Sequence, residues 1–353
     1  MALWELAEFV TPRFLGFVRN IPVPEQFQGN RWLPPENVDD IEVEVIKGAR
    51  ERRVMAKVIA YEAETPIGPR PGLGEKIRLS LPPIKLKERI GEQEIIRFKQ
   101  PRAGTADQQT AIRAVYDTTT RLVQSIFARV EWLQLQALSE PTLAYNDNGV
   151  IFAIDYGIGK QWDLDVDAEL STYWDDHVNS DPVADIGVMR DFLIDTYGVA
   201  PAELVVSRAV LAHILANEKA RALLRGTGTP VAQAILSDEE LSRITQLYNL
   251  PTIRTYDVQV ENEAHDGTIS TVRTMASNRA FLVPDTSVGS TPFGPTAEAI
   301  SDLVGTTLGQ FAPGVIAKTY GQEDPPSEWV KAAAVALPSL PSAELVQQVK
   351  VLA

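Results

Sequence analysis

The chain has 353 residues, of which 44% are hydrophobic, so it can bury a substantial core in one large domain or in two to three smaller ones. Its formal net charge of -14 argues against a surface built to grip nucleic-acid phosphates, because such a surface needs clustered Lys and Arg. It contains no cysteine, which excludes disulfides, thiolate metal sites and a cysteine nucleophile.

The segment from Met1 to Gly48 begins with a candidate amphipathic helix at Leu3 to Phe9 and then changes character. Its prolines and aromatic residues favour an extended path with aromatic anchors: Pro12, Phe14, Phe17, Pro22, Pro24, Trp32, Pro34 and Pro35. An extended arm has little core of its own, so its aromatic side chains need a neighbouring surface, either in the same chain or in another one. The sequence leaves both possibilities open.

The first residues of this arm give no sign of a membrane protein. They carry acidic side chains and lack a basic region followed by an apolar core, and no apolar run in the chain approaches the length that spans a bilayer. We therefore expect a protein made in the cytosol, without a membrane partner.

Predicted strands frame a long polar loop after the arm. Strict alternation marks Ile41 to Val45, and Arg53 to Ala60 is typical of a second strand. Three Gly and three Pro follow within Pro66 to Gly74, and apolar residues alternate again from Ile77 to Leu81. We expect a long hairpin-like loop with a flexible tip. An ordinary surface hairpin gives the same pattern, but a loop of this length without its own core tends to be functional.

A long helix is predicted from Thr105 to Leu138, where no Gly or Pro interrupts the sequence. Apolar or small residues recur at three- and four-residue steps and draw one stripe along it: Ile112, Val115, Tyr116, Thr119, Leu122, Val123, Ile126, Phe127, Val130, Leu133 and Leu138. Ser139, Glu140 and Pro141 end it. At 1.5 Å per residue the helix is about 50 Å long, which suits a strut that also contributes to a core.

The region from Gly149 to Val283 mixes helices and strands, so we expect a compact α+β or α/β unit. Strands are expected at Gly149–Tyr156, Lys160–Asp165, Glu203–Ser207 and Arg279–Val283, and helices at Asp181–Tyr197, Arg208–Arg225 with a break near Asn217, and Ser237–Leu247. Thr252–Glu261 and Thr268–Met275 are expected to pair as a hairpin. Further on, Leu345–Leu352 fits a strand that returns to a sheet built earlier.

Residues that could carry chemistry form no recognisable site. His177, His213 and His265 lie far apart in sequence and in different element types. The run from Asp163 to Asp167 resembles the start of a calcium loop, but Ala168 stands where that loop needs Gly. No complete phosphate-loop, G-x-S-x-G or H-E-x-x-H motif is present. We therefore predict no catalytic residue, no metal site and no cofactor.

The order of these elements resembles the HK97-type fold of tailed-phage major capsid proteins and, more narrowly, the lambda-type major capsid protein family. Four places carry the resemblance: KVIAYEAETPIGPRPGLGEKIRLSLPPIKLKERI, the long helix, DTYGVAPAELVVSRAVLAHILANEKARALL, and WVKAAAVALPSLPSAELVQQVKVLA. It covers nearly the whole chain and rests on order and character, without a catalytic motif.

The resemblance implies an α+β, HK97-like capsid fold with five parts. These are an N-terminal arm (1–48), an extended loop or E-loop that lies across a neighbour (49–84), a peripheral domain (85–180) with the spine helix 105–138, an axial domain (181–320), and a return to the peripheral domain (321–353). It also implies inter-subunit contacts in the arm and the loop, at Phe14, Phe17, Trp32, Ile67, Pro69, Arg70, Leu73 and Lys76. Lys57 and Lys76 lie in the loop region, but lambda-type relatives rely on decoration proteins, so we expect no isopeptide crosslink.

The implied function is a non-enzymatic subunit that self-assembles, as hexamers and pentamers, into the icosahedral head of a tailed bacteriophage. The head encloses packaged double-stranded DNA without specific binding. Assembly in the host cytoplasm would precede incorporation in the virion, and the implied partners are a scaffolding protein, a portal and a decoration protein. Two alternatives stay open. One is another assembly protein, either the shell of a phage-derived nanocompartment or a phage-derived sheath or tail component. The other is a metal- or carboxylate-dependent α/β enzyme, with paired carboxylates such as Asp175 and Asp176.

Overall fold

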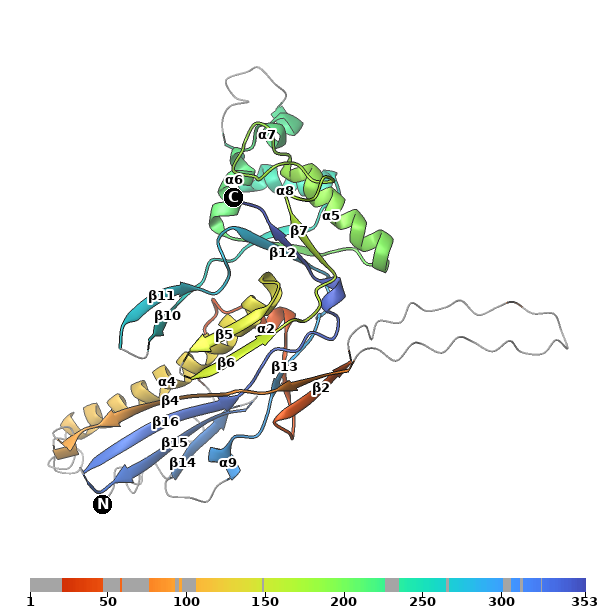
Figure 1. The fold of residues 1–353 in the computed structure, drawn as a ribbon. Coiled ribbons are helices and arrows are strands. Elements are labelled where there is room, and N and C mark those ends of the chain that lie inside the picture. The colour runs from red at the N-terminus through yellow and green to blue at the C-terminus, as the bar shows by residue number, and fades with distance from the viewer. Residues whose placement is uncertain are drawn as a thin grey trace.

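The computed structural model describes residues 21–46, 58, 76–92, 95–96, 106–147, 149–225, 235–264, 267–300, 306–311, 314–324 and 326–353. Helices and strands are mixed, as expected. The long helix α4 (Ala106–Ser139) runs beside a four-stranded sheet, and a five-stranded sheet with its own helices lies beyond the end of α4 that carries Ser139 (Figure 1).

Helix α4 confirms the helix predicted over 105–138 to within one residue at each end. It ends where the hydroxyl of Ser139 donates a hydrogen bond to the Leu135 carbonyl (2.7 Å). Its buried apolar side chains divide between two clusters: Val115, Leu122, Val123, Ile126, Phe127 and Val130 in the first, and Leu133, Leu135, Ala137 and Leu138 in the second. One helix therefore contributes to two parts of the core in succession.

The first cluster lies between α4 and a four-stranded antiparallel sheet of order β14-β15-β16-β4. The strands are β14 (Thr306–Phe311), β15 (Val315–Gln322), β16 (Ser327–Val335) and β4 (Pro83–Ile90). The face toward α4 is apolar because Ile90, Val315, Ala317, Val330, Ala332 and Ala334 alternate onto it.

The second sheet is mixed, with strand order β7-β17-β12-β8-β9. Its strands are β7 (Lys160–Asp163), β17 (Gln347–Lys350), β12 (Arg279–Val283), β8 (Glu203–Val206) and β9 (Thr252–Thr255). Strand β12 is antiparallel to both its neighbours, whereas β17 is parallel to β7 and β8 is parallel to β9.

Helices α5 (Pro182–Tyr197), α6 (Arg208–Ala216), α7 (Glu218–Arg225) and α8 (Asp238–Leu247) surround this sheet (Figure 1). Their ends follow the capping signals of the sequence. The Asp181 side chain accepts from the Ala184 N–H at the start of α5, and Gly198 ends that helix with φ of 70°. Ser237 and Glu240 form a capping box at the start of α8.

Smaller elements complete the described fold. Two-stranded antiparallel pairs are formed by β2 (Glu42–Ile46) with β3 (Lys76–Ser80), β5 (Leu143–Asp147) with β6 (Val150–Ile154), and β10 (Gln259–Glu263) with β11 (Ile269–Arg273). Strand β1 (Pro35–Asn37) is parallel to β13 (Thr291–Phe293). Short helices are α2 (Gly29–Trp32), α9 (Ala297–Ile300) and a 3-10 turn at Ala343–Leu345. No helix in the described ranges is long and apolar enough to cross a membrane.

The sheets cut across the expected domain boundaries. Strand β7 belongs to the five-stranded sheet, although we expected residues 85–180 to be peripheral. Strands β14 and β15 belong to the four-stranded sheet, although we expected 181–320 to be axial. Strand β17 pairs with β7 and β12, which agrees with the expectation that Leu345–Leu352 returns to a sheet built earlier, and the five domain ranges stay a prediction. The physical reason is that backbone pairing joins strands that are far apart in sequence, so that each sheet collects strands from several segments.

The predicted hairpin after α8 is shorter than expected. Strand β9 pairs with β8 in the five-stranded sheet, and the hairpin consists only of β10 and β11. The strand predicted over 53–60 lies outside the described residues except for Val58.

Gly289 marks a close approach between two backbone segments and gives a test of the fold. The Ser290 N–H donates to the Ser339 carbonyl (3.0 Å), and a Cβ at Gly289 would lie 1.9 Å from that carbonyl oxygen. We expect Gly289→Ala to lower the free energy of unfolding by about 1 to 3 kcal/mol, because the backbones must separate. Chemical denaturation of the unassembled subunit measures it.

The matched control is Gly187→Ala in helix α5. The nearest atom that a Cβ there would meet is Leu250 Cδ2 at 4.0 Å. Alanine is the better helix former by up to about 1 kcal/mol, so this variant should be stabilised. Equal effects at Gly187 and Gly289 would contradict the close approach.

Candidate assembly site

Six of the eight residues expected at inter-subunit contacts lie outside the described residues, so their role stays a prediction: Phe14, Phe17, Ile67, Pro69, Arg70 and Leu73. The structure does describe Trp32 and Lys76, together with the two places at which the arm and the loop are fastened to the rest of the chain.

The base of the extended loop is the β2–β3 pair, in which Glu42 lies opposite Ser80 and Ile46 opposite Lys76. Val45 and Leu79 on one face are buried in the core, with Val43 and Ile77 packed beside them. The loop therefore starts and ends on two strands whose register is fixed by an apolar face.

The other face of this base is charged. Glu44 accepts from Arg78 Nε (3.0 Å) and lies 3.7 Å from Lys76 Nζ. These side chains are at least half exposed, so each ion pair stabilises the pairing by less than about 1 kcal/mol. Lys76 lies at the mouth of the loop, and its contact with another subunit stays a prediction.

Trp32 corrects the expectation. Its side chain is only 4% exposed in the single chain, where it packs edge-on against Phe281 (5.5 Å between ring centroids) and Tyr256 (6.4 Å). The indole N–H donates to Glu203 Oε2 (3.2 Å). Trp32 is therefore an anchor within its own chain and offers no side-chain surface to another subunit.

The Glu203 carboxylate, on β8, is the centre of a hydrogen-bonded cluster at the end of α2. It accepts hydrogen bonds from Arg31 and from Arg254 Nη2 (3.0 Å) in addition to the Trp32 indole. The carboxylate is 8% exposed, so both guanidinium groups neutralise a charge that is largely removed from water. The cluster ties residues 28–32, which we call the arm segment, to the five-stranded sheet.

Glu131 ties the same segment to α4. Its carboxylate, 2% exposed, accepts from the backbone N–H groups of Gln28 and Gly29 (both 2.9 Å) and from the Tyr256 hydroxyl. Gly29 permits this approach, because a Cβ there would lie 2.8 Å from Glu131 Oε2 and 2.2 Å from Gln134 Oε1. Three parts of the chain, the arm segment, α4 and the residue after β9, therefore meet at one carboxylate.

The environment of Glu131 raises the pKa of its carboxyl group. Burial raises the pKa of the carboxyl group above its ordinary value of 4.5, and the hydrogen bonds from Tyr256, Gly29 and Gln28 lower it only in part. Burial and the neighbouring carboxylate also raise the pKa of the Tyr256 phenol, which keeps that hydroxyl a donor.

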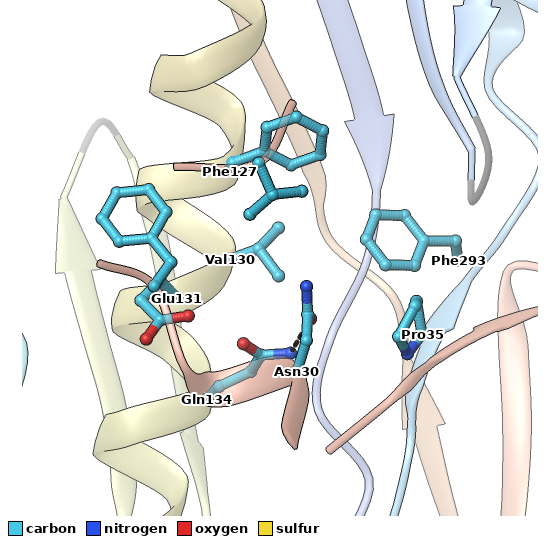
Figure 2. Close-up of a pocket in the computed structure, with 9 residues that line it drawn as sticks. Asn30, Pro35, Phe127, Val130, Glu131, Gln134 and Phe293 are labelled. Carbon is cyan, nitrogen blue, oxygen red and sulfur yellow. Dashed lines mark hydrogen bonds between the residues drawn. The ribbon is translucent and has the colours of Figure 1, made fainter. Parts of the chain in front are cut away.

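Gln134, one turn along α4, extends the junction (Figure 2). Its Nε2 donates to Asn30 Oδ1 (3.0 Å) and to Thr291 Oγ1 (2.7 Å). A cavity of about 20 Å³ lies beside it, lined by residues including Glu131 and Phe293. This volume suits about one water molecule and is far below that of a cofactor site, so the junction is an anchor rather than a ligand pocket.

Two histidines that lie far apart in the sequence are in contact in the structure. His177 Nε2 lies 2.9 Å from His213 Nδ1, and neither spacing nor element type indicated the contact. His265 lies outside the described residues. Among the described residues, no group of three or more His, Asp or Glu is placed to hold a metal ion.

Comparisons with known proteins point to proteins of phages or prophages. A model of the family described as phage major capsid protein E matches residues 13–351. A phage-related protein from Bordetella bronchiseptica RB50 is 14% identical, with a TM-score of 0.55 and 96% of each chain covered. A prophage protein of E. coli CFT073, described as a capsid protein, is 15% identical, with a TM-score of 0.53 over 79% of this chain and 80% of that chain. At these identities the two structures establish a shared fold. No curated protein matches.

Glu131 gives a pH test of the junction. Because folding raises its pKa, the folded state binds the proton more tightly than the unfolded state, and this stabilisation is lost as the pH rises through the folded pKa. We expect the free energy of unfolding of the wild type, minus that of Glu131→Gln, to fall as the pH rises above about 4.5 and then to level off. Urea unfolding of both proteins across this range measures it.

The control is Glu239→Gln at an exposed position at the start of α8. In this variant the free energy of unfolding should depend on pH in the same way as in the wild type. A difference between the wild type and Glu131→Gln that does not change with pH would contradict the raised pKa.

Proposed function

This chain belongs to the phage major capsid protein E family, and from that premise we propose how its parts build a shell. The observation that carries the assignment is the family match over residues 13–351, which is nearly the whole chain. The protein is a capsid shell protein of a tailed phage, a component of the virion that assembles into a multimeric shell. The HK97-like fold expected from the element order is confirmed by the likeness to phage structures.

In the proposed shell the arm and the loop reach neighbouring subunits. What supports this is the way the chain fastens both: the arm segment is held at Glu131 and Glu203, and the loop is held at the β2–β3 base. Between these fixed points the sequence supplies apolar and Pro-rich stretches, with Ile67, Pro69 and Leu73 as the residues expected to touch a neighbour.

The proposed assembly is an icosahedral head of hexamers and pentamers around double-stranded DNA. The net charge of -14 supports enclosure without specific binding, because a lining without net positive charge does not trap the genome. Assembly takes place in the host cytoplasm on a scaffolding protein and around a portal, with a decoration protein as a further partner. The subunit has no catalytic role in this proposal.

Deleting Thr65 to Glu75 tests the role of the loop. The deletion leaves the β2–β3 pairing in place, so we expect a folded, soluble subunit that no longer forms closed shells. Negative-stain electron microscopy and size exclusion, with the scaffold co-expressed, measure the outcome. A second variant replaces the same residues with an equal number of Gly and Ser, which separates loop length from loop sequence. Normal closed shells from both variants would rule out the proposed contact.

A further inference from the structure

The charge of this chain is distributed unevenly. Residues 160–300, which supply most of the five-stranded sheet and its helices, contain 10 Lys and Arg but 21 Asp and Glu. That segment therefore carries most of the net charge of -14. Copies with such a surface repel one another at long range, so contacts between them need local charge complementarity.

A basic surface lies on the four-stranded sheet, on the side away from α4. Alternate residues of β4, Lys85, Lys87 and Arg89, are exposed, and they lie opposite Ala333, Lys331 and Trp329 of β16. Residues paired in this way share one face of the sheet. We call Lys85, Lys87, Arg89, Trp329 and Lys331 the basic face.

The orientation of the basic face follows from the residues between its members. Glu88 of β4 forms an ion pair with Arg121 of α4, and Ala332 and Ala334 of β16 pack in the cluster under α4. Since side chains alternate along a strand, Lys87, Arg89 and Trp329 point to the opposite side. Strand β4 is also the edge of its sheet, so a partner can approach it from the side.

Part of the basic face is neutralised within the chain and part is not. Glu298 of α9 accepts from Lys85 (2.8 Å) and from Lys331 (2.5 Å). Lys87 Nζ instead lies 4.4 Å from the ring centroid of Trp329, which stacks on Tyr320. Within the described part of the chain, Lys87 and Arg89 form no salt bridge.

The β10–β11 hairpin presents the opposite charge. Glu261 and Glu263 are exposed on alternate positions of β10, and neither forms a salt bridge with a described residue. Asn262 between them accepts from Arg129 of α4 (2.6 Å), which directs the two glutamates away from α4. Ile269, opposite Glu263 on β11, is 64% exposed. We call Glu261, Glu263 and Ile269 the acidic face; Figure 1 shows its hairpin standing apart from the five-stranded sheet.

We propose that the acidic face of one copy docks on the basic face of a neighbouring copy in the shell. This inference rests on the proposed function. Alternate residues of a strand are about 6.6 Å apart, so Glu261 and Glu263 have the same spacing as Lys87 and Arg89. Ile269 supplies an apolar contact for Trp329 beside the charges.

Docking of this kind joins two different surfaces, so it is a head-to-tail contact that can repeat around a ring. Its charged groups are exposed, and screening at physiological ionic strength acts beyond about 8 Å. The contact should therefore steer and select neighbours, and high salt should weaken it.

Charge reversal tests the pairing. Lys87→Glu/Arg89→Glu and Glu261→Lys/Glu263→Lys should each reduce the yield of closed shells about tenfold or more, because like charges then face each other. The combined variant with all four substitutions should restore the yield. Each variant is expressed as the full chain with its scaffold, and the sedimenting fraction and electron micrographs give the yield. Thermal unfolding of the unassembled subunit checks that the fold is unchanged.

The matched control is Arg208→Glu/Arg243→Glu, which makes the same change of charge at exposed positions of α6 and α8. It should leave the shells intact, and loss of shells in this control would overturn a contact specific to the basic face. Normal shells from both reversed variants, or no recovery in the combined variant, would also overturn the docking.

A nucleic-acid contact gives a different result. If Lys87→Glu/Arg89→Glu forms normal shells but its phage heads retain less DNA, the basic face contacts the genome and the docking is wrong. A wild-type chain that forms no shells under any condition would overturn the shell function itself, and the docking with it, so the two failures are distinguishable.

Discussion

The arrangement of this chain depends on one buried carboxylate, that of Glu131 on α4. An ionised group in the interior is tolerated only where hydrogen bonds replace its water, and here the replacements come from two backbone N–H groups of the arm segment and from the phenol of Tyr256. The donors come from two stretches that lie far apart in sequence, and the carboxylate itself comes from a third. Satisfying the carboxylate therefore fixes where the arm segment crosses the helix and where the end of β9 meets both.

The buried and exposed charges of this protein have different roles. At the loop base, Glu44 and its basic neighbours are solvated, and the apolar side chains beneath them decide the register. At Glu131 and Glu203, removing one partner would leave a polar group without water, so these contacts select one geometry. Two carboxylates that are largely removed from solvent thus fix the position of residues 28–32 against α4 and the five-stranded sheet.

Features that depend on residues close together in the sequence could be predicted, and most features that depend on residues far apart in the sequence could not. The limits of α4 and α5 follow from local periodicity and from residues such as Asp181 and Gly198, and the predicted ranges of both helices were confirmed. Which sheet β7 and β15 join could not be predicted, because pairing between distant strands leaves no local signal, whereas the return of β17 to an earlier sheet was expected and is observed.

At the candidate site, Trp32 was misplaced because an aromatic residue on an extended segment looks the same whether its own chain or a neighbour buries it. The position of Glu131 in the sequence does indicate that its side chain is buried. It lies four residues after Phe127 and four before Leu135, so it falls on the buried stripe of the helix rather than on its solvated side.

The position of β17 has a consequence for how the protein is made. Among the described strands, β7 pairs only with β17, and the Trp162 indole N–H donates to Gln347 Oε1 across 185 positions of sequence. At about 5 to 20 residues per second, a ribosome needs on the order of ten seconds or more to add that many residues. Throughout that interval β7 is without its partner, and the five-stranded sheet is complete only once translation has passed Lys350. This sheet therefore cannot complete its folding while the segment between its first and last strands is still being synthesised.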